Sequence, residues 1–83
     1  MDRTDILDKL RDIYVMAVPD AKVDASVITE GMNLLTDLGM SSINLLYMVI
    51  AMEEFFDIRF DDVSFGDFAN VGEVIDYIQK KKA

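Results

Sequence analysis

Two adjacent serines, Ser41 and Ser42, stand between a glycine turn and a long apolar segment in "DLGMSSINLL". Serine is a preferred helix N-cap, because its oxygen accepts a hydrogen bond from a backbone N–H that has no helical partner. If Ser41 is the cap, Ser42 lies in the first turn with its hydroxyl toward solvent. A helix N-terminus favours an attached anion there by about 0.3–1 kcal/mol. From the residues alone a plain cap is the simpler interpretation, and a covalently attached phosphate ester is the alternative.

The composition argues against autonomous catalysis. The chain has no cysteine and no histidine, so it lacks a disulfide, a thiolate metal site, a cysteine nucleophile and the commonest general base. A serine hydroxyl needs an activating base to become a nucleophile, and none is evident. We therefore expect no catalytic residue.

The net charge of −8 bears on the partners of the chain. Such a charge repels nucleic acids and anionic membranes, and it attracts partners with basic patches. An EF-hand calcium loop would need oxygen ligands at its positions 1, 3 and 5 and glycine at position 6. With Gly66 at position 6, position 3 is Val63, and with Gly72 there, positions 3 and 5 are Ala69 and Val71. We therefore expect no metal site and no nucleic-acid partner.

The first predicted helix is "TDILDKLRDIYVMAV", residues 4–18, with Asp2 or Thr4 as its cap and Pro19 at its end. Its apolar side chains recur at helical spacing: Ile6, Leu7, Leu10, Ile13, Tyr14 and Ala17. Residues 19–40 show no sustained period and predict a long loop, held to the core by Leu34, Leu35 and Leu38. Long loops are often functional.

The strongest helix prediction covers residues 42–56, "SINLLYMVIAMEEFF". Its inward stripe is predicted to be Ile43, Leu46, Val49 or Ile50, and Phe55. Met40, Leu45, Tyr47 and Met48 cannot all lie on that stripe, so we expect apolar surface at the start of this helix. Exposed apolar clusters often mark a binding face. Among the six methionines and five phenylalanines, we favour ordinary core filling over a lipid pocket.

The C-terminal part is predicted to be a loop with one short helical turn, followed by a last helix. In the loop, Phe60, Val63, Phe65 and Phe68 are predicted to face inward. The last helix, "NVGEVIDYIQKKK", begins with a capping-box pattern at Asn70 and Glu73. Val71, Val74, Ile75 and Ile78 form its apolar face.

These elements predict an all-α fold: a small bundle of three main helices plus one short helix, in a single domain over residues 1–83. No apolar run approaches the ~20 residues of a membrane span, and the N-terminus lacks the layout of a signal peptide. We expect a cytoplasmic, free-standing, monomeric protein.

The segment "DLGMSSINLLYMVIAMEEFFDIRF" resembles the acyl carrier proteins, whose hallmark is an Asp-Leu-Gly turn before an Asp-Ser-Leu at the start of a long helix. The match is carried by Asp37, Leu38, Gly39 and Ser42, then by Ala51, Glu53, Glu54, Phe55 and Asp57. It extends to "VGEVIDYI" and covers roughly Thr4 to Lys80. The resemblance implies that Ser42 carries a 4′-phosphopantetheine arm, transferred from coenzyme A by a phosphopantetheinyl transferase. The thiol of the arm would hold acyl groups for acyl-transferring and acyl-modifying enzymes.

The residues that differ from the family pattern lie on the surface that is expected to contact partners. Ser41, Asn44 and Tyr47 stand where the family often has Asp, Asp and Glu, and Arg59 replaces another acid. We predict a partner-binding face formed by Asp37, Met40, Ser41, Asn44, Leu45, Tyr47, Met48, Glu53 and Glu54. Its partly neutral character suggests a specialised fatty-acid or polyketide-type pathway. A peptidyl or aryl carrier, or an unmodified interaction module on the same fold, are the alternatives.

Overall fold

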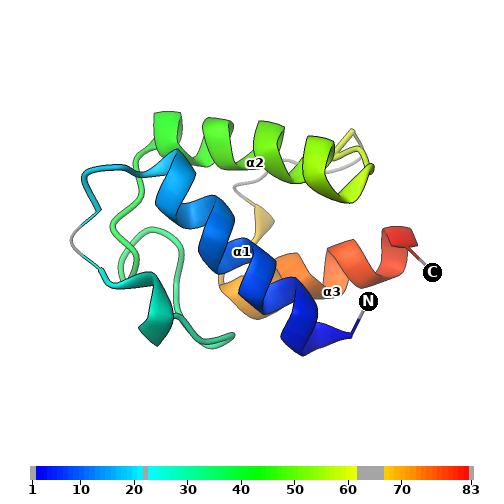
Figure 1. Cartoon of the computed structure of the whole chain (residues 1–83), viewed down its shortest axis with the longest axis horizontal. Coiled ribbons are helices and arrows are strands. Elements are labelled where there is room, and N and C mark those ends of the chain that lie inside the picture. The colour runs from blue at the N-terminus through cyan, green and yellow to red at the C-terminus, as the bar shows by residue number, and fades with distance from the viewer. Residues whose placement is uncertain (1, 22, 62–66, 83) are drawn as a thin grey trace.

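The computed structural model describes residues 2–21, 23–61 and 67–82. Its α-helices are α1 (Arg3–Ala17), α2 (Ser42–Phe56) and α3 (Val71–Lys82), and one 3₁₀ turn, η1 (Ala25–Val27), lies in the long connection. Figure 1 shows α1 rising from the level of α3 to the start of α2. Within the described ranges the chain forms no strand, only an isolated bridge between Asn33 and Asn70. The predicted all-α class is confirmed.

The short helix was predicted within residues 57–68. Part of that segment, residues 62–66 with Val63 and Phe65, lies outside the described residues, and Asp67 directly after it has 3₁₀ conformation. The turn η1, before α2, was not predicted. Phe60 is buried as predicted and stacks on Tyr77, with ring centroids 5.0 Å apart. Phe68 meets the same tyrosine edge to face at 5.6 Å. In the described part of the chain, no helix is long and apolar enough to cross a membrane.

Helix α1 follows its sequence pattern. Asp2 caps it, because the Asp2 carboxylate accepts a hydrogen bond from the Asp5 N–H at 2.9 Å, and the helix ends before Pro19. The predicted apolar face is buried at every position except Leu7, which is half-buried. Spacing was sufficient here because most residues on the other faces of the helix are polar, although Val15 and Met16 are exposed.

Helix α2 buries a different face from the predicted one. Met48, Met52 and Phe56 point into the core. The predicted inward residues Ile43, Leu46, Ile50 and Phe55 are instead between 51% and 63% exposed, and Val49 is half-buried. The prediction was wrong because this helix is apolar on most sides, so a 3.6-residue period fits more than one face. Contacts with α1 and α3 select the face, and flexible methionines fill the space between these helices.

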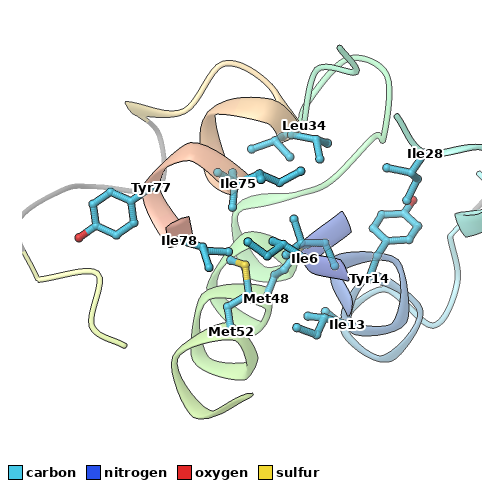
Figure 2. Close-up of a cluster of buried hydrophobic side chains, with 14 of the residues drawn as sticks. Ile6, Ile13, Tyr14, Ile28, Leu34, Met48, Met52, Ile75, Tyr77 and Ile78 are labelled. Carbon is cyan, nitrogen blue, oxygen red and sulfur yellow. The ribbon is translucent and has the colours of Figure 1, made fainter. Parts of the chain in front are cut away.

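The core joins all three helices and the long connection. In Figure 2, Ile6 from α1 lies near Met48 of α2 and Ile78 of α3, and Tyr14 from α1 lies beside Ile28 of the long connection. Met40, Met48 and Met52 are buried, which confirms that these methionines fill the core. Of the three leucines predicted to hold the connection, Leu34 and Leu38 are buried, but Leu35 is 57% exposed and that part of the prediction was wrong.

Backbone hydrogen bonds hold the long connection against the start of α3. The Val71 N–H donates to the Met32 carbonyl at 3.0 Å, and the Gly72 N–H donates to the Glu30 carbonyl at 2.8 Å. A Cβ at position 72 would lie 3.2 Å from that carbonyl oxygen, so glycine allows the close approach. Arg3 adds an ionic link between α1 and Glu30, and it also donates to Gln79 in α3 at 3.0 Å.

The start of α3 carries the predicted cap in a modified form. The Asn70 side-chain oxygen accepts from the Glu73 N–H at 2.9 Å, as an N-cap does. The Glu73 carboxylate reaches back to the Ala69 N–H at 2.6 Å, one residue earlier than in a standard capping box. The side chains of Asn70 and Glu73 therefore both accept backbone N–H groups at the start of α3.

Tyr14 links α1 to the turn that precedes α2. Its ring is buried, and its hydroxyl donates to the Leu38 carbonyl at 3.0 Å. Burial raises the pKa of the Tyr14 hydroxyl, because the phenolate would be poorly solvated in the core. The neutral hydroxyl thus holds the turn in place.

The first prediction tests the register of α2. Met52→Ala should lower the free energy of unfolding by about 2–5 kcal/mol, since it leaves a cavity in the core. Ile50→Ala, at a predicted core position that the structure exposes, should change it by no more than about 0.5 kcal/mol. Urea unfolding followed by circular dichroism measures both. A larger loss of stability for Ile50→Ala than for Met52→Ala would show that the face predicted from the sequence is the buried face of α2.

The second prediction concerns Tyr14. Tyr14→Phe should cost about 1–3 kcal/mol at neutral pH, because it leaves the Leu38 carbonyl buried without its donor. The wild type should lose stability as the pH rises above about 10, since the unfolded chain ionises its tyrosine before the folded chain does. Tyr14→Phe should lose less over that range. Unfolding curves from pH 7 to 11 measure this, with Tyr47→Phe as the control that should behave as the wild type.

Candidate functional site

The segment before α2 is a turn held by its own side chains. The Asn33 side-chain oxygen accepts from the N–H groups of Leu35 and Thr36, both at 2.9 Å. The Asp37 carboxylate accepts from the Asn33 N–H at 2.7 Å. Asp37 is exposed, and through this hydrogen bond it stabilises the turn. The turn fixes where the chain enters α2.

Gly39 and Met40 connect this turn to the helix. Gly39 has a φ of +63°, in the left-handed region that favours glycine. The Met40 N–H then donates to the Leu34 carbonyl at 3.3 Å, and the Met40 side chain is only 4% exposed. The predicted place of Met40 on a partner-binding surface is therefore wrong. It anchors the chain in the core immediately before the serines.

Ser41 is the N-cap of α2 and forms a complete capping box with Asn44. The Ser41 oxygen accepts from the Asn44 N–H at 3.2 Å, and the Asn44 side-chain oxygen accepts from the Ser41 N–H at 3.1 Å. The Asn44 amide also donates to the Ala17 carbonyl at the end of α1, at 3.4 Å. Asn44 thus ties the start of α2 to α1, a role that its place among the predicted partner-binding residues did not suggest.

Ser42 is the first residue of α2 and is exposed, as the sequence predicted for the residue after a capping serine. Its hydroxyl makes no hydrogen bond within the part of the chain that the structure describes. The capping work is done by Ser41, so the Ser42 oxygen is accessible to an incoming group. The positive end of the helix dipole lies beside it and favours an attached anion. Among the described residues, no group of three or more acids is placed to hold a metal ion.

The outer face of α2 carries an apolar strip, formed by Ile43, Leu46, Tyr47 and Ile50, which we call the outer strip. These four side chains are between 54% and 63% exposed. Of the predicted surface residues only Tyr47 belongs to it, since Leu45 is half-buried and Met48 is 4% exposed. The signal for the strip was present in the spacing i, i+3, i+4 and i+7, but the same spacing also describes an inward face.

The predicted acids at the end of α2 have different environments. The half-buried Glu53 accepts the Phe60 N–H at 2.8 Å and so holds the chain beyond the helix. Glu54 is exposed. Arg59, a departure from the family pattern, is exposed nearby and lines a shallow depression with both glutamates. This end of α2 is therefore of mixed charge rather than uniformly acidic.

Among the described residues, the core of the bundle encloses a small void. Its volume is about 10 Å³, and its walls include Tyr14, Leu38, Met48 and Val74. Such a void is the size of about one water molecule. In this conformation that void, between described residues, is too small for an acyl chain.

Comparison with known proteins points to one family. The profile described as "Phosphopantetheine attachment site" matches residues 4–78. An acyl carrier protein of Thermotoga maritima is 33% identical over 79 residues, which cover 95% of this chain and 94% of that protein. One from Helicobacter pylori is 32% identical, with 86% and 91% covered. One from Syntrophobacter fumaroxidans is 36% identical, with 74% and 75% covered.

The match spans the described elements except the first residue of α1 and the end of α3, so it includes the turn, the capping box and the outer strip. Proteins of this family are carriers, not enzymes, and bear a covalently attached 4′-phosphopantetheine. They are loaded by a phosphopantetheinyl transferase and exchange cargo with acyl-handling enzymes. This chain belongs to the acyl carrier protein family.

Proposed function

We propose that Ser42 is the residue that carries the 4′-phosphopantetheine arm, and that the chain is a single carrier domain over residues 1–83. The supporting observation is the exposed Ser42 hydroxyl, free of hydrogen bonds to the described residues, at the start of α2. Ser41 is a poor candidate, because its oxygen both accepts from the Asn44 N–H and donates to the Asn44 side chain at 3.0 Å. Modification of Ser41 would break the cap.

The attachment reaction forms a phosphodiester. The Ser42 oxygen attacks the phosphorus of coenzyme A that bears the pantetheine, loses its proton, and displaces adenosine 3′,5′-bisphosphate. The chain has no histidine, so the transferase supplies the base that takes the proton. The new phosphate would lie at the N-terminus of α2, where backbone N–H groups and the helix dipole favour its charge. When bound, the arm supplies the thiol that holds acyl groups as thioesters.

We further propose that partners dock on the outer strip, which begins at Ile43, immediately after Ser42. An enzyme that receives the arm must cover this surface, because the arm leaves the protein beside it. Exposed apolar side chains suit a partner with an apolar groove rather than a basic patch. Asp37, Ser41, Asn44, Leu45, Glu53 and Glu54 remain proposed contacts at its edges. This surface supports a specialised fatty-acid or polyketide-type pathway with its own enzymes.

The third prediction tests the attachment site. After incubation with coenzyme A and a promiscuous phosphopantetheinyl transferase, the wild type should gain the mass of one phosphopantetheine. Ser42→Ala should gain none. Ser41→Ala should still be converted, although loss of the cap should cost about 0.5–2 kcal/mol of stability. Intact mass spectrometry measures the gain, and circular dichroism shows that each variant is folded.

Two outcomes of that experiment would contradict the proposal. Conversion of Ser42→Ala would place the arm on another residue. Failure of the folded wild type, under conditions that convert a control carrier and with several transferases, would favour the unmodified interaction module.

The fourth prediction tests the choice of partners. Tyr47→Glu restores an acid that the family often has, and it should raise the rate of acylation by a housekeeping malonyl transferase about tenfold at low salt. The gain should shrink as salt screens the charges. Val27→Glu, at an exposed apolar position on η1, is the charge-matched control. Asn44→Asp is less informative, because it also removes the hydrogen bond to Ala17. Equal rates for Tyr47→Glu and wild type would count against a specialised partner surface.

A further inference from the structure

A half-open groove of about 400 Å³ lies beside the start of α2. One wall comes from the connection after α1 and includes Val18, Ala21 and Val23. The other comes from the turn before α2 and includes Thr36 and Gly39. In Figure 1 these two segments lie at the end of the molecule where α1 finishes and α2 begins. Leu38 lines both the groove and the void in the core, and the other lining residues of the two differ.

The size of the groove suits a small-molecule ligand. Ligand sites in proteins commonly have volumes of about 300–1,000 Å³, and this groove falls within that range. The void in the core, at about 10 Å³, does not. The groove, unlike that void between described core residues, therefore has room for part of the arm.

The groove lies within reach of Ser42. Two of its lining residues, Gly39 and Asn44, flank this serine three residues before it and two residues after it. Since consecutive Cα atoms are 3.8 Å apart, Ser42 is at most about 11 Å from either end. A group tethered at Ser42 meets the groove at a high effective concentration, so weak contacts are enough to hold it.

The lining has a distinct chemistry. Val18, Ala21 and Val23 offer apolar surface, and the side chains of Asp20 and Thr36 offer oxygen acceptors. Asp37 also lines the groove, and its carboxylate already accepts the Asn33 N–H. Apolar surface beside oxygen acceptors favours a ligand with methyl groups and N–H or O–H donors. The pantetheine part of the arm has two methyl groups, a hydroxyl and two amides, whereas its phosphate stays at Ser42.

We infer that the pantetheine part of the arm rests in this groove when no partner is bound. The phosphate lies at the N-terminus of α2, the methyl groups pack on Ala21 and Val23, and the amides donate to the oxygen atoms of the lining. The outer strip and the groove lie on different sides of the start of α2. A partner docked on the strip therefore leaves the groove uncovered, and the arm can move from the groove into the active site of the partner. This inference rests on the proposed attachment at Ser42.

The test uses the whole holo protein, after intact mass has shown that one arm is present. Nuclear Overhauser effects should connect the two arm methyl groups to the methyl groups of Ala21 and Val23. Alkylation of the arm thiol by iodoacetamide should be about threefold slower than for free pantetheine, as expected if the arm is docked two-thirds of the time. Ala21→Trp fills the groove and should remove most of this protection.

Val27→Trp is the control, because Val27 is exposed on η1 and does not line the groove. It should leave both the Overhauser effects and the protection unchanged. Overhauser effects from the arm methyl groups to α3 instead, or an alkylation rate equal in wild type and Ala21→Trp, would overturn the inference. Absence of the arm from the protein would instead contradict the proposed attachment, so the two failures are distinguishable.

Discussion

The hydrogen bonds between Ser41 and Asn44 are the interaction on which the rest of the site depends. They satisfy the backbone N–H groups of Ser41 and Asn44, and they engage the hydroxyl of Ser41 while that of Ser42 stays accessible. Through its amide, Asn44 also fixes this helix start to the last carbonyl of α1. On the other side of the turn, the Tyr14 hydroxyl holds the Leu38 carbonyl. The serine pair is therefore held from α1 at two points.

The second constraint is that α2 has apolar residues on two opposite faces. Met48, Met52 and Phe56 complete the core, whereas the outer strip remains exposed. Leaving four large apolar side chains in water gives no stability to the isolated domain, so the strip is best explained by what it binds. Asn44, next to the strip, holds the start of α2 to the end of α1.

The buried face of a helix could be predicted from the sequence where its other faces are mostly polar. The predictions for α1 and α3 are confirmed because charged residues cover most of the surface outside the buried stripe. The cap roles of Asp2, Ser41 and Asn70 depend on neighbours within a few residues. The inward face of α2 could not be predicted, because its apolar residues surround the helix. Leu35 was predicted to hold the connection to the core together with Leu34 and Leu38, but only those two leucines are buried.

Other features depend on contacts between residues that are distant in the sequence. Nothing near Asn44 indicates that its amide donates to a carbonyl 27 residues earlier. The groove likewise brings together two connections that share no sequence pattern. The placement of Ser42 could be predicted from local rules, but the surroundings that suit its arm could not.

The central claim is that Ser41 holds the helix and Ser42 holds the arm. A proton–phosphorus correlation spectrum of the uniformly labelled holo protein tests both halves at once. We predict a cross peak between the arm phosphorus and the β-protons of Ser42, together with an Asn44 amide proton that exchanges slowly because it still donates to Ser41. A cross peak to the β-protons of Ser41, or rapid exchange at Asn44, would contradict the account.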